Sequence, residues 1–149
     1  WRLPRWSVRW RYREARDVSR SVNYDRMSYM SRPSELSNFR AAAAALALLV
    51  LVQAVLAGQF LTGEGGRSAH RLIGEALGLV ALAVAAAGYR LRGVDRDRWW
   101  LGLALVAMVV AQTGLGFAGR DAATAAALHV PLGVATFGAA LVAALPRLR

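Results

Sequence analysis

Cysteine and lysine are both absent from this chain of 149 residues, and histidine occurs only twice. Without cysteine the chain has no disulfide, no thiolate metal site and no cysteine nucleophile. The sequence also contains no phosphate-binding glycine loop, no HExxH zinc motif, and no serine or aspartate set beside a base. These absences exclude the common hydrolase and nucleotide-binding chemistries and leave the two histidines as the main candidate site residues.

Long apolar runs dominate what is present, because 56% of the residues are hydrophobic. A bilayer core about 30 Å thick requires roughly 20 helical residues, and only helices or closed barrels satisfy their backbone in lipid. The sequence therefore predicts an all-α membrane protein. Its four spans are expected over about 41–62, 70–89, 99–119 and 123–145. The first run could alternatively be a signal peptide cleaved near Ala57, but its length favours a retained span.

Arginines provide all 19 basic residues, and their distribution predicts the orientation of the spans. Ten lie in residues 1–40, four lie between the second and third runs, and two lie at the C-terminal end. The positive-inside rule places these regions in the cytoplasm, so both chain ends are expected there. The short connections favour an up-down-up-down four-helix bundle in the bacterial plasma membrane. Because the arginines lie at the ends of apolar runs, the net charge of +10 does not indicate nucleic-acid binding.

The segment 1–40 is basic, carries interleaved tryptophans, and is expected on the cytoplasmic side. It could lie on the anionic inner surface of the membrane. For residues 1–26 we favour another interpretation, that they precede the native start, since Met27 and Met30 are both plausible start residues. The four-helix transmembrane domain is expected over 41–146.

A weak internal repeat with a period of 59 residues contains both histidines. Gln53 precedes His70 by the same spacing as Gln112 precedes His129, and a glycine follows each histidine four residues later, Gly74 and Gly133. The pattern predicts that the bundle consists of two helical-hairpin repeats, and repeats in membrane proteins commonly place a binding site at their interface. For the glutamines, packing between helices is favoured over a role in orienting imidazoles.

The repeat places His70 and His129 in one outer layer of the membrane, facing each other across the bundle. Two imidazoles approaching one point from opposite sides suit heme iron, so we predict a bis-histidine b-type heme. Gly74 and Gly133 would make room for the macrocycle edge, and Arg71 would neutralise a propionate. A simpler interpretation is that Arg71 forms a surface ion pair with Glu75, four residues later on the same helix. We favour this interpretation for Glu75. Zinc is disfavoured, since only two strong ligands are present.

These motifs resemble one four-helix half of the heme A synthase family. The resemblance rests on His70-Arg71 at the start of a span, on Gln112 with Gly116, and on Ala127-Leu128-His129. It covers about residues 41–146 and implies two histidines, from the second and fourth helices, that hold a heme near the outer face. The family's glutamate three residues before the first histidine is replaced by Arg67, and its loop cysteines are absent. The chain also resembles small four-span membrane proteins common in actinobacteria.

The leading functional hypothesis is therefore a membrane heme b protein for electron transfer or heme handling, acting alone, as a homodimer or with a redox partner. One alternative is a cofactor-free membrane subunit or scaffold whose small-residue faces pack against partner helices. A second alternative is an enzyme similar to heme A synthase that acts as a dimer. The substitution at Arg67 argues against the enzyme.

Overall fold

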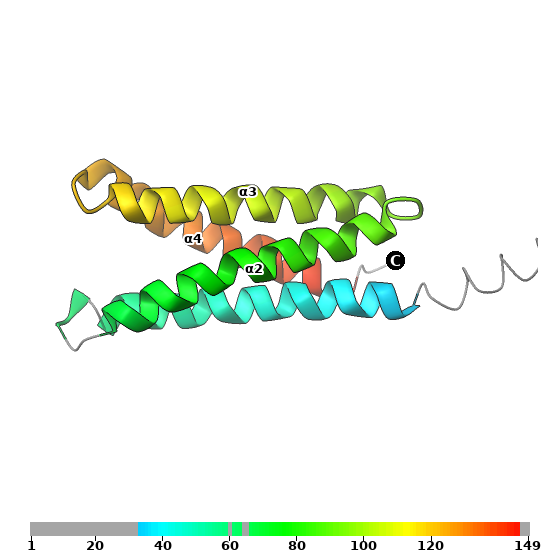
Figure 1. Cartoon of the computed structure of the whole chain (residues 1–149), viewed down its shortest axis with the longest axis horizontal. Coiled ribbons are helices and arrows are strands. Elements are labelled where there is room, and N and C mark those ends of the chain that lie inside the picture. The colour runs from blue at the N-terminus through cyan, green and yellow to red at the C-terminus, as the bar shows by residue number, and fades with distance from the viewer. Residues whose placement is uncertain (1–32, 60, 64–65, 147–149) are drawn as a thin grey trace, which may run out of the picture. The chain divides into compact units, whose positions relative to one another are not determined.

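A computed structural model of the chain describes residues 33–59, 61–63 and 66–146, and these residues form four helices (Figure 1). The first helix spans Pro33–Gln59, α2 spans Arg67–Leu91, α3 spans Arg96–Ala118 and α4 spans Ala123–Ala144. All four are long and apolar enough to cross a membrane. For the described residues, the prediction of an all-α structure with four helices long and apolar enough to span a membrane is therefore confirmed. The interpretation offered for residues 1–26 lies outside the described residues.

Three of the helices begin before the apolar runs that predicted them. The first helix begins at Pro33, a residue that the first turn of a helix tolerates because its missing N–H needs no partner there. The α3 helix begins after Asp95, whose side chain accepts a hydrogen bond from the Arg98 backbone N–H at 3.3 Å. The α2 helix follows Gly66, whose φ of 83° favours glycine. An apolar run thus marks the lipid-embedded part of a helix, whereas capping residues set its ends.

Consecutive helices run in opposite directions, and the chain after α4 returns to the end of the bundle at which the first helix begins (Figure 1). The α2 and α3 helices approach closely at two glycines. A Cβ atom added at Gly88 would lie 2.7 Å from the Arg98 carbonyl oxygen, and one added at Gly102 would lie 2.9 Å from Ala85 Cα. Small residues let helix backbones pack closely in membranes, where the hydrophobic effect does not drive helices together.

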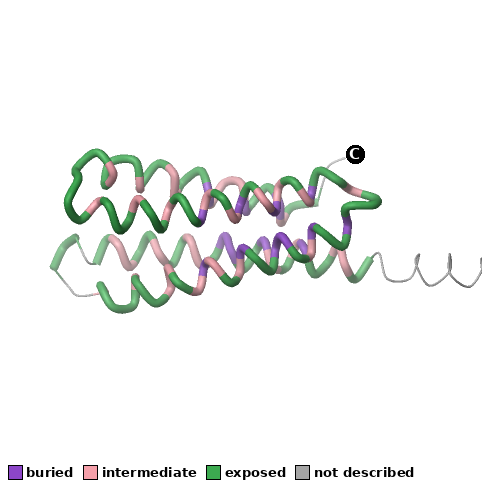
Figure 2. Tube along the Cα trace, turned by 45° about the horizontal axis from the view of Figure 1, so that its top comes forward, coloured by how far each residue is buried: buried purple, intermediate pink, exposed green. Residues whose placement is uncertain are grey.

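Burial is confined to one half of the bundle (Figure 2). The buried residues of the first helix and α2 lie within 39–47 and 77–91, and those of α3 and α4 lie within 98–109 and 136–143. We call these four segments the packed half. Its largest fully buried side chains are Phe39, Leu46, Val84, Leu105 and Thr136. We call the segments 51–59, 66–76, 110–118 and 123–135 the open half, in which no described residue is buried.

Polar contacts strengthen the packed half at the ends of the helices. The buried Arg98 side chain pairs with Asp95 at 2.8 Å, and its guanidinium lies over the Phe39 ring at 5.2 Å. Arg40 Nε donates to the Ala144 carbonyl oxygen at 3.0 Å, which gives the C-terminal turn of α4 one of the partners it lacks within the helix. These contacts connect the first helix to both α3 and α4.

Candidate functional site

His70 lies in the first turn of α2 and forms a reciprocal contact with Gln53 of the first helix. Its Nδ1 lies 3.2 Å from the Gln53 backbone oxygen, and Gln53 Nε2 donates to the His70 backbone oxygen at 2.7 Å. The two bonds join the first helix to α2 in the open half. The side chains of both residues are half-buried. The two helices of this hairpin are thus connected by polar contacts at the level where they have no buried apolar core.

His129 lies in the second turn of α4 and makes a similar contact with Gln112 of α3. Its Nδ1 lies 2.9 Å from the Gln112 backbone oxygen. The Gln112 amide behaves differently from that of Gln53, because its Nε2 lies 3.4 Å from His129 Nε2 instead of binding a backbone oxygen. That distance is long for a hydrogen bond. Each histidine is therefore directed by its Nδ1 to the glutamine of its own hairpin.

These contacts determine the tautomer of both imidazoles. A backbone carbonyl oxygen only accepts hydrogen bonds, so Nδ1 of each ring carries the proton and Nε2 carries the lone pair. Metal-binding histidines commonly have this arrangement, in which one ring nitrogen donates to a carbonyl and the other coordinates the metal. Both histidines therefore present the nitrogen that could bind a metal.

The glycine four residues after each histidine makes room for the glutamine amide. A Cβ atom at Gly74 would lie 3.0 Å from Gln53 Nε2, and one at Gly133 would lie 2.9 Å from Gln112 Nε2. The sequence predicted that these glycines make room for a macrocycle edge, whereas the groups beside them in the structure are the amides. The sequence signal was present in the equal spacing of glutamine, histidine and glycine, but its meaning depends on how the helices of each hairpin face each other.

Two buried oxygen atoms at the site have no hydrogen-bond partner among the residues that the structure describes. They are Oε1 of Gln53 and Oε1 of Gln112, which occupy equivalent positions in the sequence repeat. Their Nε2 atoms are the ones that face the histidines, so exchanging oxygen and nitrogen would place an acceptor against an acceptor. Each of these oxygens could accept a hydrogen bond from a water or a ligand at the site.

Arg71 lies on the surface beside the histidine that precedes it. Its Nε pairs with Glu75 Oε1 at 3.0 Å, and the two side chains are 72% and 61% exposed. The predicted pair at helical spacing is therefore present. The Arg120 guanidinium lies 5.0 Å from the centre of the Phe117 ring. A propionate role for Arg71 stays a prediction, and it would require the carboxylate of the ligand to replace or join that of Glu75.

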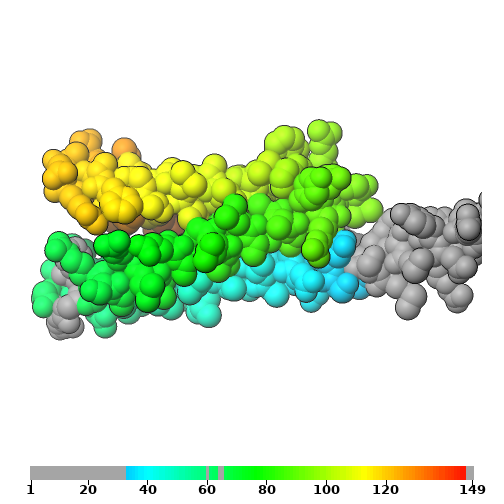
Figure 3. All heavy atoms as spheres, in the orientation of Figure 1, coloured from blue at the N-terminus to red at the C-terminus, as the bar shows by residue number. Residues whose placement is uncertain are grey.

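The surroundings of the histidines are loosely packed. Figure 3 shows the surface hollowed between α2 and α3 at the end that carries the histidines, while the opposite end is closed. No described residue of the open half is buried, so side chains from the two hairpins do not interdigitate there as they do in the packed half. The open half can therefore admit a ligand without first displacing a core.

Within the described part of the chain, no three His, Cys, Asp or Glu side chains come together as a metal site. A heme iron needs only two protein ligands because the macrocycle supplies the other four. Comparisons of the chain with protein families, with curated proteins and with solved structures give no match.

Proposed function

We propose that the chain binds one b-type heme between His70 and His129 and serves electron transfer or heme handling in the membrane. The observation that carries the proposal is the shared geometry of the two imidazoles. Each donates through Nδ1 to the backbone oxygen of a glutamine that lies 17 residues earlier, and each thereby directs a lone pair to Nε2. Two such nitrogens suit the two axial positions of a heme.

A recurring pattern of burial supports the two-hairpin repeat on which this proposal depends. Six of the ten buried residues of the first helix and α2 have a buried counterpart 59 residues later, in α3 or α4. The pairs are Phe39 and Arg98, Ala43 and Gly102, Leu46 and Leu105, Leu77 and Thr136, Ala81 and Ala140, and Val84 and Ala143. We infer two copies of one hairpin, related by an approximate twofold axis along the membrane normal. Such an axis would make His70 and His129 equivalent, and our proposal places the heme between them.

The open half supplies the space that a macrocycle would need. Heme is flat and mostly apolar, so its insertion between the hairpins would bury apolar side chains that are exposed in the described structure. Those nearest the histidines include Leu72 and Leu128, which are 66% and 56% exposed. The packed half would hold the hairpins at a fixed separation while the ligand enters.

The protein residues would orient the heme and hold it, and the heme would supply reversible transfer of one electron. The backbone oxygens of Gln53 and Gln112 would keep each Nδ1 protonated and each ring in place. His70 and His129 together would hold the group, and a site with two histidines suits electron transfer. The same proposal places both ends of the chain in the cytoplasm. It also includes pairing with a redox partner or with a second copy of the chain.

The test is an absorption spectrum of the detergent-purified protein, oxidised and then reduced with dithionite, with added hemin where needed. We expect a sharp α band and a shifted Soret band in the wild type, and loss of the α band in His70→Ala and in His129→Ala. The matched controls are Leu79→Ala and Val142→Ala, which alter exposed residues of the same two helices away from the histidines and should keep the spectrum. A colourless wild type that fails to take up hemin would contradict the proposal.

A second candidate function, a cofactor-free membrane subunit, is favoured by one contact. Gln112 Nε2 lies near His129 Nε2, so the amide partly occupies the position that iron would need. On this alternative the glutamine and histidine pairs serve only to join helices. A wild type without heme affinity, in which the histidine variants lose thermal stability, would favour this second function.

A further inference from the structure

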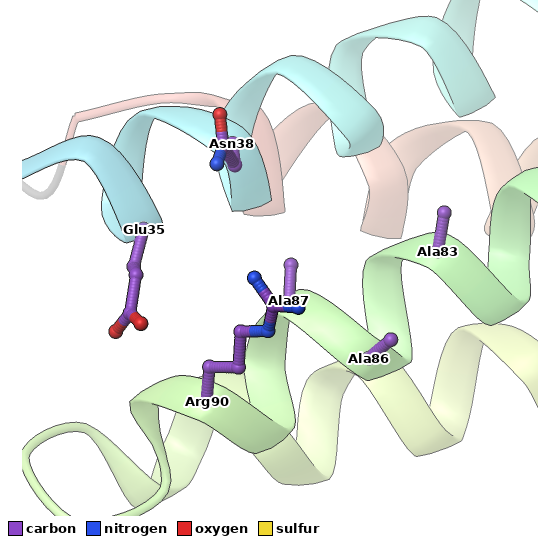
Figure 4. A pocket seen from close by; sticks show the side chains of 6 residues that line it. All are labelled: Glu35, Asn38, Ala83, Ala86, Ala87 and Arg90. Carbon is purple, nitrogen blue, oxygen red and sulfur yellow. The ribbon is translucent and has the colours of Figure 1, made fainter. Parts of the chain in front are cut away.

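A hollow lies between the first helix and α2 near the end of the packed half. It is far from His70 along α2 and far from Gln53 along the first helix. Its volume is about 220 Å³. Three alanines of α2 form its apolar part, and three polar side chains surround it (Figure 4). The lining residues are Glu35, Asn38, Ala83, Ala86, Ala87 and Arg90. The heme proposal does not involve this hollow.

Two opposite charges point into the hollow from different helices. Figure 4 shows the Glu35 carboxylate and the Arg90 guanidinium directed to the space between the first helix and α2. Within the described part of the chain, no ion pair joins Glu35 to Arg90. The space between a carboxylate and a guanidinium that remain apart is suited to a molecule that carries both a cation and an anion.

The hollow has a polar end and an apolar end that match the depth profile of a bilayer. Arg90 lies in the last turn of α2, where the helix leaves the apolar region. Ala83 lies seven residues earlier, which places it about 10 Å deeper at 1.5 Å per residue. Ala83 and Ala86 are exposed within the chain, so this side of the hollow opens to lipid. A ligand that fills it would have a zwitterionic head and an apolar tail.

We propose that this hollow binds phosphatidylethanolamine. The lipid ammonium donates to the Glu35 carboxylate, with the Asn38 amide oxygen as a second acceptor, and the phosphate accepts from the Arg90 guanidinium. One acyl chain lies over the three alanines. Phosphatidylglycerol carries an anionic head without an ammonium, so Glu35 repels it. Phosphatidylcholine carries a quaternary ammonium without N–H donors, so it cannot donate to the carboxylate.

The site is specific to the first hairpin. At the positions 59 residues after Glu35 and Ala83 the chain has Val94 and Val142, so the second hairpin lacks both the carboxylate and one of the small floor residues. One lipid per chain is therefore expected. Because the hollow is partly exposed, each charged hydrogen bond is weakened by solvent, so the preference for phosphatidylethanolamine should be about threefold to tenfold.

The experiment is native mass spectrometry of the full chain in detergent, titrated with dioleoyl forms of the three lipids. We expect one bound lipid, with phosphatidylethanolamine preferred. Glu35→Gln should abolish the preference over phosphatidylcholine and relieve the exclusion of phosphatidylglycerol, and Arg90→Gln should weaken binding of both phosphatidylethanolamine and phosphatidylglycerol. Ala86→Leu should reduce binding of all three lipids, because the added side chain fills the apolar floor.

The matched controls are Arg92→Gln, which removes a nearby arginine outside the hollow, and Ala104→Leu, which enlarges an exposed alanine of α3. Both should bind lipid as the wild type does. Equal binding of the three lipids by the wild type would overturn the proposal. So would a phosphatidylethanolamine preference that survives Glu35→Gln and Arg90→Gln, because the lipid would then be recognised elsewhere.

Discussion

Leu46 and Leu105 are fully buried in the packed half, whereas Gln53 and Gln112, two turns further along the same helices, remain half-buried in the open half. The packed half joins all four helices through small residues and apolar side chains. In the open half, the described polar contacts between helices join only the two helices of the same hairpin. The difference shows how a small bundle can fix its helices at one end and keep space between its hairpins at the other.

The largest expected effect comes from removing a buried leucine of the packed half. Leu105→Ala should lower the free energy of unfolding by about 2 kcal/mol or more, because a cavity remains where the side chain was. Leu128→Ala in the open half should change it by less than about 0.5 kcal/mol, since that side chain is already 56% exposed. Equilibrium unfolding in detergent measures both variants. Equal losses would contradict the division into two halves.

The next effect concerns the close approach of α2 and α3. Gly88→Ala would place a methyl group 2.7 Å from the Arg98 carbonyl oxygen, so the two helices must move apart. We expect a loss of about 1–3 kcal/mol. Gly78→Ala in the same helix is the control, because no atom lies within 4 Å of its added Cβ, and it should be neutral or stabilising by up to about 1 kcal/mol. Thermal unfolding of both variants should separate them, and a Gly88→Ala variant as stable as Gly78→Ala would exclude the tight crossing.

A smaller effect is expected in the open half, where glycine makes room for an amide. Gly133→Ala should displace Gln112 Nε2, which lies 2.9 Å from the added Cβ, and cost about 0.5–1.5 kcal/mol. Hemin affinity should fall with it if the glutamine helps to position His129. Gly138→Ala in the same helix meets no atom within 4 Å and serves as the control. Hemin titration and equilibrium unfolding of Gly133→Ala and Gly138→Ala test the expected losses of affinity and stability. Equal hemin affinity and equal stability of the two variants would contradict these expectations.

The smallest effect concerns the surface pair near the site. Arg71→Gln removes an ion pair whose side chains are 72% and 61% exposed, so the free energy of unfolding should change by less than about 0.5 kcal/mol. A larger loss in the protein without heme would show that Arg71 supports the open half structurally. The measurement is the same unfolding experiment, repeated at high salt, where the difference from the wild type should disappear.

Much of the fold could be predicted from the sequence because lipid imposes simple requirements on it. Four apolar runs predicted four helices, and a spacing of four residues predicted the pair of Arg71 with Glu75. Three of the four helices extend before the apolar runs, since the start at Pro33 and the cap at Asp95 lie outside those runs. Asp95 before Arg96 is a recognisable capping signal that could have located the start of α3.

The arrangement of the site could be predicted only in part. The equal spacing of glutamine, histidine and glycine singled out the residues that the structure places together within each hairpin. It did not reveal that the glutamine amide would lie over the glycine, because that contact depends on the rotation of each helix about its axis. The separation into packed and open halves has no local signal either, since the apolar content of each helix is high throughout.

The measurement that tests the central claim most directly is low-temperature electron paramagnetic resonance of the oxidised, hemin-loaded protein. The account predicts the low-spin ferric signal of iron with two imidazole ligands in the wild type, and a high-spin signal in both His70→Ala and His129→Ala. A high-spin wild type, or a low-spin signal that persists in either variant, would contradict the claim that these two histidines hold one heme together.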